Sequence, residues 1–195
     1  MSKSLFIHGQ WESGSGAPLT SVCPVDDSTV WEKNSASAAD VDRAFSAARK
    51  AFPLWWDLGA DQRIQFCQRF SELVSQKSEE LAALIGRETG KPLWEAKTEV
   101  AAVAGKIGLS IESFRSRRDT TSFDMAGSLA VTRFKPHGVC AVLGPFNFPA
   151  HLPNGHIVPA LIAGNTAVFK PSEITPAVGE WLAQQWEAAG LPPGV

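Results

Sequence analysis

Asn147, Lys170 and Glu173 are the residues of this sequence whose types and neighbours suggest chemistry. Asn147 lies in the run Gly-Pro-Phe-Asn-Phe-Pro, where two prolines restrict the backbone and two phenylalanines flank the amide. A side-chain amide held in this way can donate to the oxyanion that forms when a nucleophile adds to a carbonyl. The residue types alone also allow a loop asparagine that satisfies nearby backbone groups.

Lys170 and Glu173 belong to the run Lys-Pro-Ser-Glu. A lysine can donate to ribose hydroxyls, and a carboxylate can accept from the 2′-OH of an adenosine ribose while it repels a 2′-phosphate. The pair therefore indicates an oxidoreductase cofactor site that takes NAD rather than NADP. A solvated ion pair on the surface is the alternative that the spacing leaves open.

Each motif follows an apolar run of strand length. Residues 139–143 are continuously apolar, which predicts a parallel strand covered on both faces, and residues 166–169 predict a second buried strand. Helices are predicted over about 157–163 and from 176 to near 190. In a right-handed β-α-β-α unit both strands end at one edge of the sheet, where open α/β folds bind ligands.

The residues before position 137 predict a different organisation. Short β-prone runs over residues 6–11 and 22–31 predict an N-terminal arm with hairpin character. Residues 122–127 are expected to form a loop, and residues 129–134 an exposed or intersubunit strand. Between the arm and this loop we expect four helices: one from the N-cap Ser37 to Pro53, one from about Asp61 to Gln76, one from the cap Ser78 to Gly90, and one that follows Pro92 and reaches Arg115 or beyond.

The composition excludes several classes of protein. With 195 residues, 44% of them apolar, the chain can form a core, and 18 basic against 20 acidic residues do not indicate a nucleic-acid partner. The one basic cluster, residues 115–118, is interpreted as a helix end. No apolar run approaches the roughly 20 residues that span a bilayer, so we expect a soluble, cytosolic protein without a membrane partner.

Cysteine and histidine spacing does not indicate a metal or a disulfide. Cys23, Cys67 and Cys140 are far apart, so free structural thiols are expected. His151 and His156 are separated by a predicted Pro-Asn-Gly turn and have no third ligand nearby. No metal site is predicted.

Three motifs together carry a family resemblance. The run Gly-Pro-Phe-Asn-Phe-Pro, the segment Pro-Ala-Leu-Ile-Ala-Gly-Asn at 159–165 and Lys-Pro-Ser-Glu-Ile-Thr-Pro at 170–176 resemble the aldehyde dehydrogenase superfamily. The resemblance extends through Arg-Glu-Thr-Gly-Lys-Pro at 87–92 and Ile-His-Gly-Gln-Trp at 7–11, so it covers essentially the whole chain. Within that superfamily, residues 150–156 resemble the group that acts on N-succinylglutamate 5-semialdehyde.

The resemblance implies an α/β fold, namely the amino-terminal portion of the aldehyde dehydrogenase fold, with a helical layer and the start of a Rossmann-like parallel sheet. It implies four parts: an N-terminal arm with a hairpin (1–35), a helical layer of the NAD-binding domain (36–118), an oligomerisation-type strand or arm (119–136) and a first β-α-β-α unit of the NAD-binding sheet (137–195). A homo-oligomer is expected, because the strand in the third part belongs to an oligomerisation element in the family.

Residue by residue, the resemblance implies the following roles. Asn147 matches the asparagine that stabilises the oxyanion, and Phe148 matches a position near the aldehyde tunnel. The residues expected to bind NAD are Leu143, Gly144, Pro145 and Phe146 along the dinucleotide, and Lys170, Ser172 and Glu173 at the adenosine ribose.

In this family a cysteine thiolate attacks the aldehyde, hydride leaves to NAD, and a glutamate activates the water that hydrolyses the thioester. The matching cysteine and glutamate fall beyond the equivalent of Val195. We therefore expect the chain to be the amino-terminal part of an enzyme and to be inactive alone.

The expected function of the parent enzyme is NAD-dependent oxidation of N-succinylglutamate 5-semialdehyde to N-succinylglutamate in arginine catabolism. Two alternatives remain: a non-catalytic nucleotide-binding or interaction module, and a dehydrogenase of another aldehyde such as succinate semialdehyde. The acidic substrate would need cations, for which Lys106, Arg115, Arg117 and Arg118 are candidates.

Overall fold

The computed structural model describes residues 3–118 and 120–195. The predicted boundary at residue 119 lies outside these ranges. The N-terminal arm forms the antiparallel pairs β1–β2 and β3–β4, which confirms its hairpin character. The arm strands are β1 (Leu5–Ile7), β2 (Gln10–Glu12), β3 (Pro18–Val22) and β4 (Thr29–Asn34).

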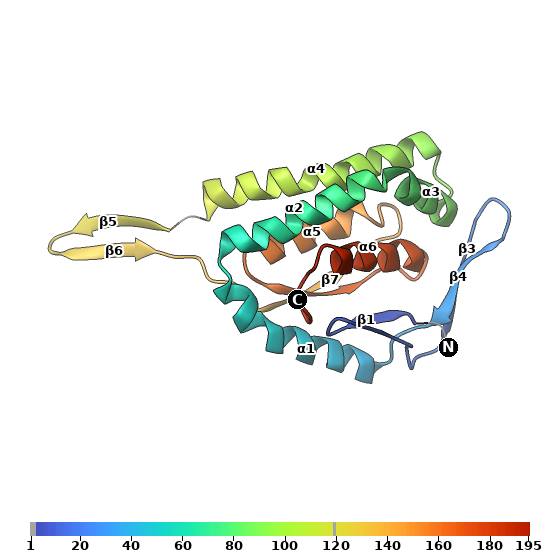
Figure 1. Cartoon of the computed structure of the whole chain (residues 1–195), viewed down its shortest axis with the longest axis horizontal. Helices are drawn as coiled ribbons and strands as arrows, with labels where there is room; N and C mark the ends of the chain where they lie inside the picture. Colours follow the sequence, from blue (N-terminus) through green and yellow to red (C-terminus); the bar gives the residue numbers. More distant parts are fainter. Residues whose placement is uncertain (1–2, 119) are drawn as a thin grey trace.

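Four helices follow the arm. They are α1 (Ala38–Asp57), α2 (Ala60–Gln76), α3 (Ser78–Thr89) and α4 (Leu93–Arg117). Figure 1 shows α2, α3 and α4 side by side on one side of the molecule, while α1 lies on the other. Ser37 caps α1 as predicted, but α3 already includes Ser78, and its N-cap is Lys77, which makes no side-chain cap.

The prediction that Pro53 ends the first helix is wrong. The helix continues to Asp57 with Pro53 inside it. Proline removes one helical hydrogen bond, but packing holds the last turn: Trp55 is buried, and its indole N–H donates to the carbonyl of Leu161 at 3.1 Å. A tertiary contact therefore overrides the local stop signal.

The β-α-β-α unit is confirmed, with β7 (Val139–Leu143) and β8 (Thr166–Lys170) paired in parallel, α5 (His151–Ile162) between them and α6 (Pro176–Ala188) after them. Helix α5 begins six residues before the predicted start at 157. Its first N–H groups are capped from α4 rather than by a local side chain, so the nearby sequence gives no start signal.

The two faces of β7 and β8 are covered unequally. Val142 is buried in the same cluster as α5, and Thr166 on the opposite face donates to the carbonyl of Ala48 on α1. Leu143, at the carboxyl end, is 74% exposed. Ala141, on the same face, is exposed as well, so the prediction that residues 139–143 are covered on both faces is wrong for the face that carries Ala141 and Leu143. Contact with α1 on that face is made at the amino end of β8, through Thr166.

Residues 122–127 are not a loop, which corrects another prediction. They belong mostly to β5 (Thr121–Met125), which pairs with β6 (Ser128–Thr132) through a turn at Ala126 and Gly127. Both turn residues have positive φ, as in two-residue hairpin turns whose backbone twist matches the twist of the flanking strands. Alanine is unusual at a position with positive φ, so the sequence did not predict a hairpin turn at residues 126 and 127. The β5–β6 ribbon projects away from the body (Figure 1).

One hydrophobic core joins the helices to the sheet. Phe70 of α2 stacks on Trp186 of α6 with ring centroids 3.9 Å apart, and Ile157, Val158 and Leu161 of α5 belong to the same buried cluster. Among the described residues, no helix combines the length and the apolar content that a bilayer crossing requires. The core thus fixes α5 and α6, and with them the loops that follow β7 and β8.

Candidate functional site

The two sequence motifs meet at the carboxyl edge of the β7–β8 pair. Leu143 and Lys170, the last residues of the strands, are paired, and the N–H of Gly144 donates to the carbonyl of Lys170 at 2.9 Å. Phe146 is 54% exposed and Lys170 is also exposed. The edge therefore presents both motifs on an accessible surface, as the sequence predicted.

A buried ion pair holds the backbone of Asn147. The ammonium of Lys91 donates to the carbonyl of Asn147 at 2.8 Å and to Glu99 Oε2 at 2.8 Å, and it lies 4.2 Å from the ring centre of Phe148. The side chains of Lys91 and Glu99 are 9% and 0% exposed. In the described part of the chain, the side-chain amide of Asn147 makes no hydrogen bond to protein, so the backbone is fixed while the amide stays available.

Glu99 also fixes the start of the helix that follows the loop. Its Oε1 accepts from the backbone N–H groups of Ala150 and His151 at 3.0 and 3.1 Å. A carboxylate at a helix N-terminus satisfies orphan donors and complements the helix dipole. Sequence reasoning missed Lys91 and Glu99; the available signal was a carboxylate next to Val100 on the apolar face of a helix.

The loop after β8 carries the second motif. Lys170 Nζ and Glu173 Oε2 are 3.0 Å apart, and both side chains are more than half exposed. The backbone N–H of Glu173, followed by the bond from Lys170, lowers the pKa of this carboxyl below its usual value. Ser172 is buried and its hydroxyl accepts from the N–H of Ile174, so it shapes the turn, and its predicted cofactor contact stays a prediction.

The cysteines do not form a reactive centre. Cys67 is completely buried, and burial raises the pKa of its thiol to about 12. Burial also raises the pKa of Cys140, which is only partly covered. A thiol with a raised pKa is a poor nucleophile at neutral pH.

His151 and His156 are not separated by a turn, which corrects a prediction. Both lie in α5, where a spacing of five residues places them on different faces. His151 makes an edge contact with Phe148, and its Nδ1 is buried with no hydrogen-bond partner in the described residues. No group of three potential metal ligands occurs in the described ranges.

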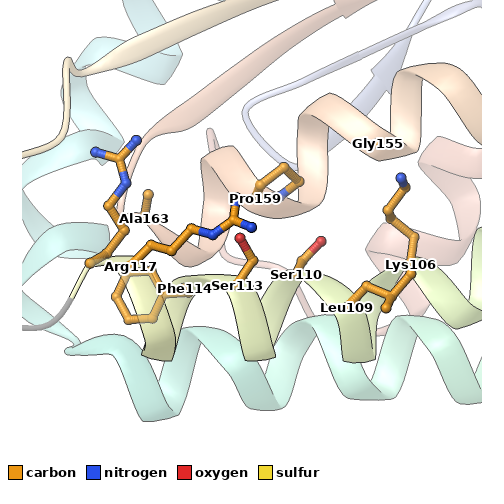
Figure 2. A pocket seen from close by; sticks show the side chains of 10 residues that line it. Lys106, Leu109, Ser110, Ser113, Phe114, Arg117, Gly155, Pro159 and Ala163 are labelled. Carbon is orange, nitrogen blue, oxygen red and sulfur yellow. The ribbon is translucent and has the colours of Figure 1, made fainter.

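The four candidate cations, three on α4 and Arg118 at its C-cap, separate into two groups. Lys106, Arg117 and Arg118 line a pocket between α4 and α5, whereas Arg115 does not (Figure 2). The pocket has a volume of about 420 Å³.

Residues 11–195 match the profile of the aldehyde dehydrogenase family. The chain belongs to this family. The predicted resemblance and the α/β fold class are thereby confirmed. Over 191 residues the chain is 56% identical to the N-succinylglutamate 5-semialdehyde dehydrogenase of Burkholderia cenocepacia, a match that covers 98% of this chain and 39% of that protein. Thus the chain spans 39% of the length of this relative.

Several solved structures share the fold of this chain. PnpE in complex with nicotinamide adenine dinucleotide is 34% identical with a TM-score of 0.92, and the match covers 100% of this chain and 40% of that chain. The NADP-dependent glyceraldehyde-3-phosphate dehydrogenase of Bacillus halodurans, solved with NADP, is 25% identical with a TM-score of 0.92 and 42% of its chain covered. Structural neighbours of this chain therefore include both an NAD complex and an NADP complex.

Proposed function

We propose that this chain forms the nucleotide-binding part of an aldehyde dehydrogenase that oxidises N-succinylglutamate 5-semialdehyde with NAD. The observation that carries the proposal is the meeting of the Asn147 loop and the Lys170–Glu173 turn at one exposed strand edge, joined by the Gly144–Lys170 hydrogen bond. The name of the 56% identical relative supports the substrate.

The cofactor would lie along the edge of the sheet. Leu143 and Phe146 present exposed apolar surface to the dinucleotide, and Lys170 donates to ribose hydroxyls. Glu173 favours NAD because its carboxylate accepts from a 2′-OH and repels a 2′-phosphate. Glu173 carries a negative charge at neutral pH, since its pKa is lowered from a value that is already acidic.

Asn147 would act on the aldehyde. Its exposed amide donates to the oxygen that becomes negative when a nucleophile adds to the carbonyl, while Phe148 borders the substrate. NAD, when bound, accepts the hydride. The buried Cys67 is not suited to be the nucleophile, and Cys23 is buried as well. We therefore propose that the 195-residue chain does not oxidise aldehydes by itself.

Calorimetric titration of the chain with NAD and with NADP tests the cofactor. We expect NAD to bind more tightly than NADP, and Glu173→Gln to reduce this preference because the variant lacks the repelling charge. Glu72→Gln removes the same charge from an exposed position on α2 and should leave the preference unchanged. Equal binding of NAD and NADP by the unchanged chain would refute the assignment of Glu173.

Activity is tested by joining this chain to the remaining part of the Burkholderia cenocepacia enzyme. We expect NAD reduction with N-succinylglutamate 5-semialdehyde to exceed that with succinate semialdehyde. If succinate semialdehyde is preferred, the second aldehyde hypothesis replaces the first. A folded fusion protein that oxidises neither aldehyde, combined with NAD binding by the chain, would instead favour a nucleotide-binding module.

A further inference from the structure

Three cations line the pocket between α4 and α5, and the described residues of its lining include no acid. Its lining includes Lys106, Arg117 and Arg118, and none of its ten lining residues is acidic. Ser110 and Ser113 add hydroxyls that point from α4 towards α5 (Figure 2). A pocket with this lining is suited to an organic anion, because cations and hydroxyls both donate to carboxylate oxygens.

Among the cations that line this pocket, Lys106 is partly buried, whereas Arg117 and Arg118 are exposed. Four lysines of the described chain are paired with a carboxylate: Lys33 with Glu180, Lys91 with Glu99, Lys97 with Glu79 and Lys170 with Glu173. Lys106 makes no ion pair or hydrogen bond with any described residue, although its side chain is partly buried. An ammonium with no carboxylate partner has all of its N–H donors available for the oxygens of a bound carboxylate.

A glycine provides the space for this side chain. A Cβ at Gly155 of α5 would lie 3.3 Å from Cε and 3.7 Å from Nζ of Lys106. A Cβ alone would be in close contact with the lysine, so a residue with a long side chain at position 155 would compete with Lys106 for the space against α5. The helical backbone of Gly155 does not itself require glycine, since its φ is not positive. The side chain of Lys106 occupies the space that a side chain at position 155 would enter.

The position of Lys106 relates the pocket to the Asn147 loop. Gly155 is four residues after His151, so this end of the pocket lies about 6 Å, one helical turn, from the start of α5, directly after the loop. Arg117 and Arg118 lie at the other end, about 16 Å further along α4. A substrate with its aldehyde at Asn147 can therefore extend a carboxylate towards Lys106.

We propose that Lys106, in the space left by Gly155, binds a carboxylate of the aldehyde substrate and thereby selects acidic semialdehydes. The inference rests on the proposed function for the placement of the aldehyde, but the anion site itself does not depend on NAD or on turnover. The arginines at the far end attract anions to the pocket, since exposed charges act over about 8–10 Å at moderate ionic strength.

Binding of N-succinylglutamate to the 195-residue chain, followed by calorimetry and by backbone NMR shifts, tests the site. We expect shifts on α4 and α5 around Lys106 and Gly155, and no binding of the uncharged trimethyl ester. Lys106→Met should weaken binding about tenfold, as expected for the loss of one hydrogen bond between charged groups. Lys97→Met removes the same charge from another position on α4 and should change the affinity less than twofold, as expected for an exposed site.

A second variant leaves the lysine in place. Gly155→Leu should weaken binding as much as Lys106→Met does, while leucine favours the helix over glycine and preserves α5. Gly108→Leu is its control, because a Cβ at Gly108 meets nothing within 4 Å. Unchanged affinity in both Lys106→Met and Gly155→Leu would overturn the proposal, as would equal binding of the ester.

The outcome is independent of the cofactor experiment. If NAD binds to the edge of the sheet and N-succinylglutamate does not bind at Lys106, the inference fails and the proposed function stands. If N-succinylglutamate binds at Lys106 and NAD does not bind, the anion site stands and the cofactor proposal fails.

Discussion

Asn147 illustrates how one residue depends on others far away in the sequence. Its amide is exposed, whereas its backbone carbonyl is bound by Lys91, a residue 56 positions earlier. The ammonium of Lys91 is held in turn by Glu99, so the position of a surface amide is determined by a pair that solvent scarcely reaches. A donor fixed in this way costs little reorganisation when charge develops on a substrate, which is the role that we propose for Asn147.

Asn147→Ala in the fusion protein should reduce turnover about 10²- to 10³-fold, because the oxyanion loses a donor. The NAD affinity of the chain should not change, since the Lys170–Glu173 turn is untouched. Single-turnover kinetics and calorimetry measure the two effects separately. A variant whose chemical step is as fast as that of the unchanged protein would show that Asn147 does not stabilise the oxyanion.

At the scale of elements, the helical layer supplies the caps for the helices of the β-α-β-α unit. Glu99 on α4 accepts from the first N–H groups of α5, and Glu88 on α3 accepts from Ala177 and Val178 at the start of α6. Neither helix has a side-chain cap of its own. Burial raises the pKa of Glu88, although its hydrogen bonds from Ser21 and from α6 oppose that rise.

Glu99→Gln tests this arrangement. Removing one partner of a buried pair leaves Lys91 uncompensated, so we expect the free energy of unfolding to fall by about 3–5 kcal/mol. Adding Lys91→Met should recover part of the loss, because the uncompensated charge is then absent. Urea unfolding measures both variants. Glu79→Gln breaks the exposed pair with Lys97 and should cost less than about 1 kcal/mol; similar losses at positions 79 and 99 would contradict the role of burial.

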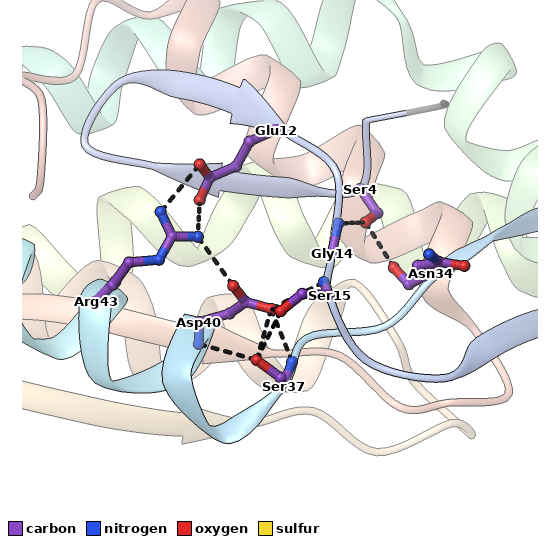
Figure 3. Close-up of polar contacts among 8 residues, drawn as sticks. All are labelled: Ser4, Glu12, Gly14, Ser15, Asn34, Ser37, Asp40 and Arg43. Carbon is purple, nitrogen blue, oxygen red and sulfur yellow. Dashed lines mark hydrogen bonds and ion pairs between the residues drawn. The ribbon is translucent and has the colours of Figure 1, made fainter.

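The start of α1 predicts a pH dependence. Asp40 accepts hydrogen bonds from Ser15 and Ser37 and pairs with Arg43, which also binds Glu12 of β2 (Figure 3). The bond from the Ser15 hydroxyl, followed by those from backbone N–H groups, holds the pKa of Asp40 far below its usual range. Asp40 therefore stabilises the fold fully above its unfolded pKa of about 3.9, and this stabilisation is lost as the pH falls below that value.

Asp40→Asn should accordingly lower the melting temperature most at neutral pH, and the difference from the unchanged chain should shrink below about pH 4. Thermal unfolding followed by circular dichroism between pH 2.5 and 7 measures this. Asp57→Asn, at the exposed end of the same helix, provides the comparison and should show little pH-dependent difference. A constant difference across the range would mean that the charge of Asp40 contributes nothing.

For the whole molecule, the β5–β6 ribbon is the part that lacks support from the core. Among the described strands its two strands pair only with each other, and Phe123, Met125 and Leu129 are each more than half exposed. An isolated two-stranded ribbon is marginal in water, and clustered exposed apolar side chains indicate an association surface. This supports the expected homo-oligomer, which we retain as a prediction.

Sedimentation velocity tests the ribbon. We expect the chain to self-associate at micromolar concentrations and the double variant Phe123→Lys, Leu129→Lys to sediment as a monomer. Phe123 and Leu129 belong to neighbouring cross-strand pairs, so their side chains lie on opposite faces of the ribbon, and the double variant places a charge on both faces. Leu54→Lys places a lysine at another exposed leucine, on α1, and should leave the association unchanged. Self-association of the double variant equal to that of the unchanged chain would exclude the ribbon.

The sequence by itself determined the parts that depend on local patterns. The strands at 139–143 and 166–169, the helix after Pro92, the cap at Ser37 and the edge that gathers Asn147 with Lys170 and Glu173 all follow from periodicity, turn residues and the right-handed connection of parallel strands. These features involve neighbours in the chain, so the neighbours reveal them.

Only the tertiary structure decided the parts that depend on distant partners. Helix α1 passes through Pro53 because Trp55 binds α5, helix α5 starts at His151 because Glu99 caps it, and Lys106 fits against α5 because Gly155 has no side chain. In each case the deciding group is about 50 or more positions away in the sequence. A contact of this kind leaves no periodic signal, since its energy appears only when the chain brings the two segments together.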